Sequence, residues 1–160
     1  MKTTYYKVVA IERKNKKVIR RSFLHKRLNG CVPANIVVTY QFGKPTSPQV
    51  EGTKLMVFDD KRQALQFQDG DKQLQVWECE VTNPTPVYYV GRFEEIMKID
   101  PTLLREMWED IMKYDQAKFE LYNFLSRLER EERASWQLLG SAPGHTFACD
   151  SVTLTKQVKE

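Results

Sequence analysis

The stretch LQVWECEV at residues 74–81 indicates the kind of fold, because it is a clear strand pattern. Its valines and its tryptophan favour extended backbone. Side chains alternate between the two faces of a strand, so Glu78 and Glu80 share one face with Leu74 and Val76. The residues on the other face are Trp77, Cys79 and Val81. This pattern predicts an antiparallel strand whose end emerges into water, opposite basic residues of a neighbouring hairpin.

The segments before this strand predict a short helix and two further strands. DDKRQALQF (59–67) has the pattern of a helix, with Asp59 or Asp60 as its N-cap. Proline cannot donate to a sheet ladder, so NPTP, which follows the strand, is expected to end it. The two further strands are NIVVTYQF (35–42) and KLMVF (54–58), joined by a loop rich in glycine and proline.

The N-terminal part of the chain predicts a β-hairpin. TTYYKVVAIER and KVIRRSFL are rich in β-branched and aromatic residues, and the short polar stretch KNKK lies between them. At the other end, HTFACDSVTLTKQV (145–158) returns to strand chemistry and predicts a C-terminal strand.

Two longer helices are predicted within residues 92–139, where no strand pattern occurs. Asp100 and Pro101 form a typical helix start, and apolar residues then recur every three or four positions. One long helix also fits this spacing, and with two helices Asp115 would cap the second. We expect Gly140 to end the helical region and the helices to pack on the sheet. Leu121, Leu125 and Leu128 have a near-heptad spacing, which suits a homodimer.

The sequence therefore predicts a single α+β domain over residues 1–160, with a mainly antiparallel sheet. No apolar run approaches the ~20 residues needed to span a bilayer, and the N-terminus lacks a secretory signal, so we expect a cytoplasmic protein. Cys31, Cys79 and Cys149 are too far apart for a zinc knuckle, and the chain has only two histidines. No metal site, cofactor or disulfide is predicted.

Positive charge is concentrated near the N-terminus. Residues 1–30 contain ten Lys or Arg and one Glu, a net charge of +9, whereas the remaining 130 residues have a net charge of −5. Clustered cations attract polyanions, and the nearby aromatic side chains of Tyr5, Tyr6 and Phe23 can stack on bases. The same lysines can also simply protect the edge of a hairpin. The candidate binding residues are Arg13, Lys14, Lys16, Lys17, Arg20, Arg21, Lys26 and Arg27.

A set of apolar and turn positions resembles small uncharacterised domains of phages and bacterial mobile elements, a group in which an ADP-ribosyltransferase-like fold has been suspected. The resemblance covers residues 35–82 and the last strand, about 60 residues. Its positions are Tyr40-Gln41-Phe42-Gly43-Lys44, Gly52, Leu55-Met56-Val57-Phe58, Ala64, Phe67, Val76, Val81 and Ser151-Val152-Thr153-Leu154. The resemblance implies architecture more than activity, since the chain lacks a Ser-Thr-Ser or His-Tyr motif at strand positions.

These observations favour a non-enzymatic binding or interaction module, which contacts nucleic acid or an acidic protein surface through the basic hairpin. The alternative is an ADP-ribosyltransferase-like enzyme that uses Glu78 and Glu80. In some such enzymes a Glu-x-Glu pair places one carboxylate on the nicotinamide ribose and the other beside the incoming nucleophile.

Overall fold

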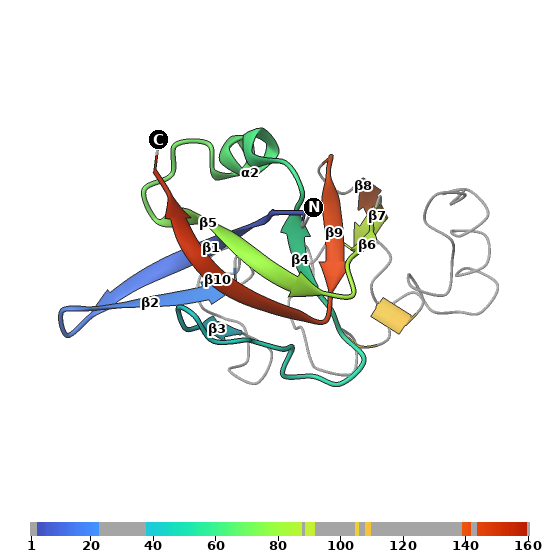
Figure 1. The fold of residues 1–160 in the computed structure, drawn as a ribbon, viewed down its shortest axis with the longest axis horizontal. Coiled ribbons are helices and arrows are strands. Elements are labelled where there is room, and N and C mark those ends of the chain that lie inside the picture. The colour runs from blue at the N-terminus through green and yellow to red at the C-terminus, as the bar shows by residue number, and fades with distance from the viewer. Residues whose placement is uncertain are drawn as a thin grey trace.

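The computed structural model describes residues 3–22, 38–87, 89–91, 105, 108–109, 139–141 and 144–159. Its strands form an eight-stranded sheet and a two-stranded sheet made of β7 and β8 (Figure 1). Every strand pair among the described residues is antiparallel, and helix α2 accompanies them, so the predicted α+β class with a mainly antiparallel sheet is confirmed. The elements are β1 (Tyr5–Lys14), β2 (Lys17–Ser22), β3 (Thr39–Tyr40), β4 (Leu55–Phe58), α2 (Lys61–Gln68), β5 (Leu74–Thr82), β6 (Thr85–Pro86), β7 (Tyr89–Gly91), β8 (Leu139–Ser141), β9 (Thr146–Cys149) and β10 (Ser151–Val158).

Strand β1 pairs with three other strands. On one edge, its residues 5–10 pair with residues 74–79 of β5. On the other edge, Tyr6 pairs with Phe58 of β4, and residues 9–14 pair with β2 to form the predicted N-terminal hairpin. The outer half of β1 therefore leaves the body of the sheet together with β2.

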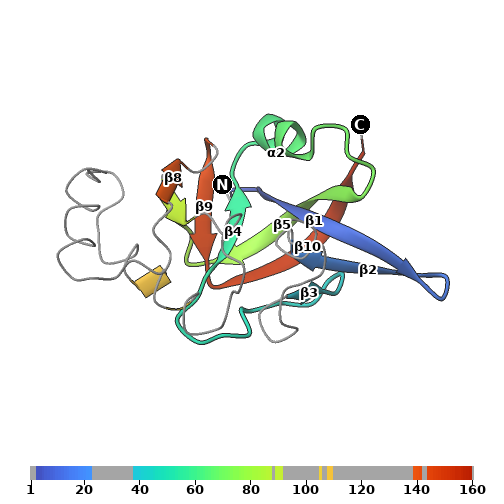
Figure 2. The ribbon, with the colours of Figure 1, turned by 180° about the vertical axis from the view of Figure 1, so that it is seen from behind.

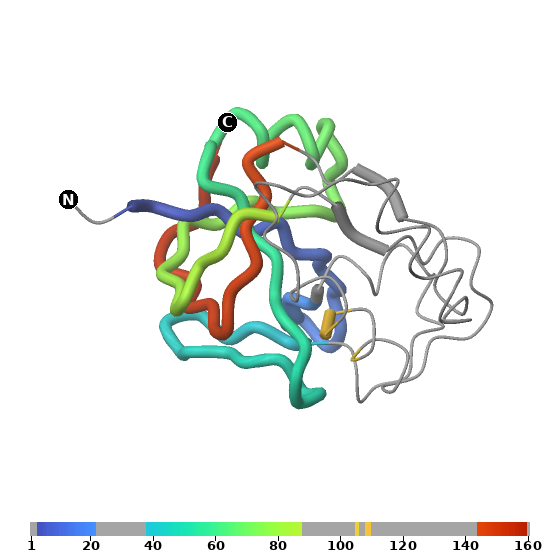
Figure 3. The backbone as a smooth tube through the Cα atoms, turned by 90° about the vertical axis from the view of Figure 1, so that its right-hand side faces the viewer, coloured from blue at the N-terminus to red at the C-terminus, as the bar shows by residue number. Residues whose placement is uncertain are grey.

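The segment after β3 closes part of the sheet into a ring. The N–H groups of Gly43 and Thr46 donate to the carbonyl oxygens of Leu154 and Val152 of β10, at N···O distances of 3.0 and 2.9 Å. Because β10 also pairs with β5, the order β10-β5-β1-β2-β3 returns to β10 through residues 43–46 (Figure 3). This closure joins residues that lie far apart in the sequence.

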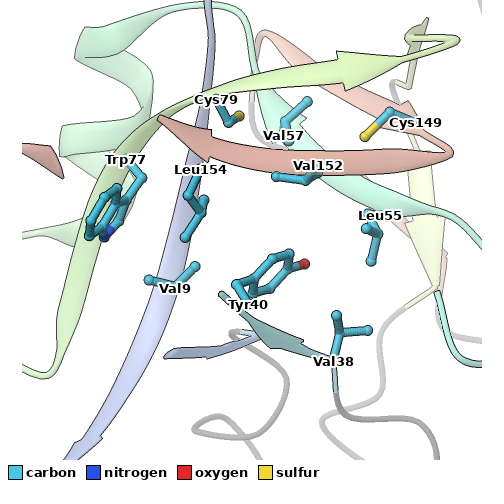
Figure 4. Packing of buried hydrophobic residues seen from close by; sticks show 10 residues of the cluster. All are labelled: Val9, Val38, Tyr40, Leu55, Val57, Trp77, Cys79, Cys149, Val152 and Leu154. Atoms are coloured by element: carbon cyan, nitrogen blue, oxygen red, sulfur yellow. The ribbon is translucent and has the colours of Figure 1, made fainter. Parts of the chain in front are cut away.

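The two faces of β1 and β5 contact different apolar clusters. On one face lies the larger core, which strands of the ring form together with β4 and β9 (Figure 4). On the opposite face, where α2 lies (Figure 2), Ala64 of this helix belongs to a second cluster that includes Val8 and Val76. Both faces of β5 are therefore covered near its start, and only its far end emerges into water, as its sequence predicts. The larger core consists of Val9, Val38, Tyr40, Leu55, Val57, Trp77, Cys79, Cys149, Val152 and Leu154.

Aspartates cap both ends of helix α2. Asp60 is the N-cap, and its side chain accepts a hydrogen bond from the N–H of Gln63 at 3.0 Å. Asp69 takes the left-handed conformation (φ 51°) at the C-cap, and its N–H donates to the carbonyl oxygen of Leu65. Asp59, the other predicted cap, instead contacts His145 Nδ1 at 2.9 Å.

The two helices predicted within residues 92–139 lie largely outside the described residues. Arg105, Trp108 and Glu109 are helical there, and Trp108 is buried. The described residues give complete bounds only for α2, so the longer helices and the homodimer through Leu121, Leu125 and Leu128 remain predictions. None of the helical segments described is long and apolar enough to cross a membrane.

The predicted end of the helical region is wrong. Leu139 and Gly140 belong to β8, where they pair with Gly91 and Val90 of β7. A glycine signals a helix end or a strand irregularity equally well, and the pairing partner, which lies some 50 residues away in the sequence, decides between them.

The predicted single C-terminal strand is in fact two strands. The break comes at Asp150, whose N–H donates to the carbonyl oxygen of Thr82 at 2.9 Å. Strand β9 pairs with β4, whereas β10 pairs with β5, so the chain moves to a different part of the sheet at this residue. The apolar pattern continues on both sides of Asp150, and therefore the sequence does not reveal the corner.

Candidate functional site

The β1–β2 hairpin extends beyond the body of the sheet (Figures 1 and 2). Its two turn residues, Asn15 and Lys16, have φ angles of 51° and 64°. Positive φ at both central residues defines the type I′ turn, whose twist matches that of the flanking strands. This tight turn leaves Arg13, Lys14, Lys16 and Lys17 exposed. These four cations are called the hairpin tip below.

The other predicted binding residues have different surroundings. Arg20 lies over the ring of Trp77, with 4.7 Å between its guanidinium carbon and the ring centroid. Arg21 forms an ion pair with Glu12 at 3.4 Å, and its buried Nε atom has no hydrogen-bond partner within the described part of the chain. Lys26 and Arg27 lie outside the described residues. The structure therefore separates four exposed cations at the hairpin tip from two arginines with intramolecular contacts at the base of the hairpin.

The aromatic residues near the hairpin are not those that the sequence suggests. Tyr5 lies at the other end of β1, where its ring packs edge-on against Phe147 at a centroid distance of 5.5 Å. Tyr6 packs against the cluster under α2, and Phe23 lies outside the described residues. Instead, Trp77 and Phe42 lie at the base of the hairpin, with ring centroids 5.7 Å apart. The sequence does not reveal this contact, because the two residues are far apart in the chain and only the pairing of the strands brings them together.

Glu78 and Glu80 share a face of β5, as predicted. Glu78 is half-buried and pairs in register with Tyr6 of β1 and Lys156 of β10, whereas Glu80 is exposed and pairs with Thr153. The pKa of Tyr6 is raised, mainly by burial and next by the negative charge of Glu78. The basic residue opposite the pair therefore comes from β10, not from the hairpin.

The larger core contains a lysine that the sequence analysis missed. Lys7 is 7% exposed, and its Nζ atom donates to the carbonyl oxygen of Met56 at 2.6 Å. The same atom lies 5.4 Å from the ring centroid of Tyr40, whose buried hydroxyl has no hydrogen-bond partner among the residues that the structure describes. Burial lowers the pKa of Lys7 and raises that of Tyr40. The sequence does give a signal for this burial, because Lys7 lies between Tyr6 and Val8 inside a strand pattern.

The two described cysteines are free thiols inside this core. Burial raises the pKa of Cys79 to about 12 and that of Cys149 to about 11. A thiol that resists ionisation is a poor nucleophile and a poor metal ligand. Within the described ranges, no group of three or more histidine, cysteine and acidic side chains is arranged to hold a metal ion.

Asp150 forms a polar cluster at the corner between β9 and β10. Its two carboxylate oxygens accept hydrogen bonds from Lys54 Nζ at 2.5 Å and Asn83 Nδ2 at 2.8 Å. The hydrogen bond from Lys54 is the larger cause of the lowered pKa of Asp150, followed by that from Asn83. Since both partners hold the carboxylate at a strand corner, the cluster stabilises the change of direction there.

Comparisons of this chain with family models, curated proteins and solved structures find no match. The resemblance to phage and mobile-element domains therefore stays a prediction.

Proposed function

We propose that the protein binds nucleic acid through the hairpin tip. The observation that carries this proposal is the exposure of four cations, Arg13, Lys14, Lys16 and Lys17, on a ribbon that extends beyond the sheet. None of them forms an ion pair with another described residue. Cations of this kind neutralise phosphates and release their condensed counterions, which favours binding.

The density of charge favours a polyanion over an acidic protein surface. The hairpin tip places four cations within five consecutive residues, and a duplex offers one phosphate per ~1.7 Å of its axis. Lysine is a flexible point charge, so these contacts should hold the backbone without distinguishing base sequences. Binding of an acidic protein is the competing outcome.

The test replaces Lys14, Lys16 and Lys17 together with glutamine, which removes charge while keeping similar side-chain length. Each phosphate contact adds roughly 0.7–0.9 to the slope of log K against log salt concentration, so the slope should fall by about two to three units. The matched control replaces Lys61, Lys72 and Lys159, which are exposed elsewhere. This control variant has the same net charge as the variant of the hairpin tip, and it should keep most of the wild-type slope.

Fluorescence anisotropy with labelled oligonucleotides of two unrelated sequences, at a series of salt concentrations, measures the slope. Polyglutamate serves as the acidic polypeptide ligand. If the slope falls equally in the two triple variants, the overall positive charge of the protein causes binding, and not the hairpin tip. If the wild-type chain binds polyglutamate but neither DNA nor RNA at low salt, the proposal is wrong.

A further inference from the structure

Phe42 is the most exposed of the large apolar side chains described, at 60%. It is the second residue after β3, and its ring is tilted by 55° against that of Trp77. A single exposed apolar residue needs no explanation by itself. Phe42 differs because its ring lies against Trp77, and the guanidinium of Arg20 lies over the same indole ring.

Arg20 is fixed beside these rings. Its Nε atom lies 3.4 Å from Gln75 Oε1, and the same oxygen accepts a hydrogen bond from Trp77 Nε1 at 3.0 Å. The guanidinium lies over the indole ring in this arrangement. The terminal nitrogens of Arg20 have no hydrogen-bond acceptor among the described residues, and a guanidinium can donate to several acceptors at once.

The strand register extends this surface along the hairpin. Arg20 pairs with Ile11, and Val18 pairs with Arg13. Paired residues share a face, and alternate residues along a strand do too, so Arg13, Val18 and Arg20 lie on one face of the ribbon. Val18 is 37% exposed, and it lies roughly 7 Å along the strand from Arg20. The surface formed by Phe42, Arg20, Val18 and Arg13, above the buried ring of Trp77, is called the Phe42 face.

We propose that the Phe42 face binds single-stranded nucleic acid. A base stacks on the exposed ring of Phe42, while Arg20 and Arg13 contact the phosphates that follow along the ribbon. Bases in a duplex are stacked on each other, and only an unpaired strand can offer a free base face to an aromatic side chain. This inference rests on the proposed function, because the hairpin tip supplies the general attraction for phosphates.

The test compares a single strand with a duplex of the same sequence, as DNA and as RNA. Phe42→Ala should weaken single-strand binding roughly 5- to 150-fold, the range expected for loss of one stacked base. Duplex binding should not change, and neither should the salt slope, because no phosphate contact is removed. Phe42→Trp should restore single-strand affinity, since a larger ring also stacks.

Met56→Ala is the matched control, because Met56 is another exposed apolar side chain, at 41%, and lies on β4, outside the Phe42 face. It should leave both affinities unchanged. Weaker binding of Phe42→Ala to either the DNA or the RNA strand supports the inference. Unchanged single-strand affinity in Phe42→Ala overturns it, and the lysine triple variant then shows whether the proposed function still stands. If the wild-type chain binds no nucleic acid at low salt, both proposals are wrong.

Discussion

Lys7 makes stability depend on pH in a way that a buried apolar residue would not. Burial disfavours the charged amine, so its pKa in the folded chain lies below the ordinary value of 10.5. Between the lowered pKa and 10.5, the unfolded chain binds a proton that the folded chain does not bind. Raising the pH through this window therefore stabilises the folded state, by up to about 1.4 kcal/mol per pH unit.

We therefore compare the free energy of unfolding of the wild type with that of Lys7→Met. We predict that the wild-type value minus the variant value increases as the pH rises toward 10.5. Urea unfolding of both proteins at several values between pH 7 and 10 measures this difference. The buried thiols act in the opposite direction, because their raised pKa values make the folded state less stable as the pH rises above 9. The charge of Lys7 itself lowers the pKa of both thiols, so the comparison is made mainly below pH 9, where the thiols are mostly protonated in the folded and the unfolded chain alike. A difference that stays constant over this range contradicts the prediction.

Glu80 distinguishes the binding module from the transferase alternative. It is exposed at the wet end of β5, and surface substitutions usually change stability by less than about 0.5 kcal/mol. We predict that Glu80→Gln keeps the wild-type unfolding free energy and oligonucleotide affinity. A transfer assay with labelled NAD is the decisive measurement. Transfer by the wild type that falls by orders of magnitude in folded Glu80→Gln would make the enzyme the better interpretation.

Single residues show where sequence analysis succeeds and where it stops. The shared face of Glu78 and Glu80 follows from the two-residue period of a strand, so it could be predicted. The contact between Arg20 and Trp77 could not, because it depends on the register of β1 with both β2 and β5. The exposure of Phe42 could not be predicted either, because the neighbouring sequence does not distinguish an exposed phenylalanine from a buried one.

At the scale of elements, the N-cap of α2 offers a test of local stability. Replacing Asp60 with alanine leaves the N–H of Gln63 without its side-chain acceptor. We predict a loss of about 1 kcal/mol in the free energy of unfolding, measured by urea denaturation. Asp60→Asn retains a side-chain oxygen and should lose much less. If asparagine destabilises the protein as much as alanine, the charge of Asp60 matters more than its hydrogen bond.

Elements formed by local signals were predicted well. The hairpin, α2 and β5 each have their own turn, cap or alternating pattern, and each is present. The corner at Asp150 was missed because it depends on partners from two other segments, Lys54 and Asn83. Strand β8 was missed for the same reason, since only its pairing with β7 distinguishes it from a helix end.

At the scale of the whole molecule, the α+β class could be predicted, but the ring of strands could not. Its closure depends on backbone hydrogen bonds between residues 43–46 and β10, and backbone groups have no sequence signature. The order of the strands in the sheet also differs from their order in the chain. Such pairings are decided by the packing of the larger core, which involves side chains from six strands.

The closure between Thr46 and Val152 has a kinetic consequence. The backbone hydrogen bonds between Thr46 and Val152 join segments that are separated by most of the chain. A long loop must therefore close before any stabilising contact forms there. Folding should therefore be slow for a protein of this size, with relaxation in milliseconds to seconds as for other sheets dominated by non-local contacts. Stopped-flow refolding from urea, followed by tryptophan fluorescence, would measure it. A main phase in microseconds would mean that the ring is not part of the rate-limiting step.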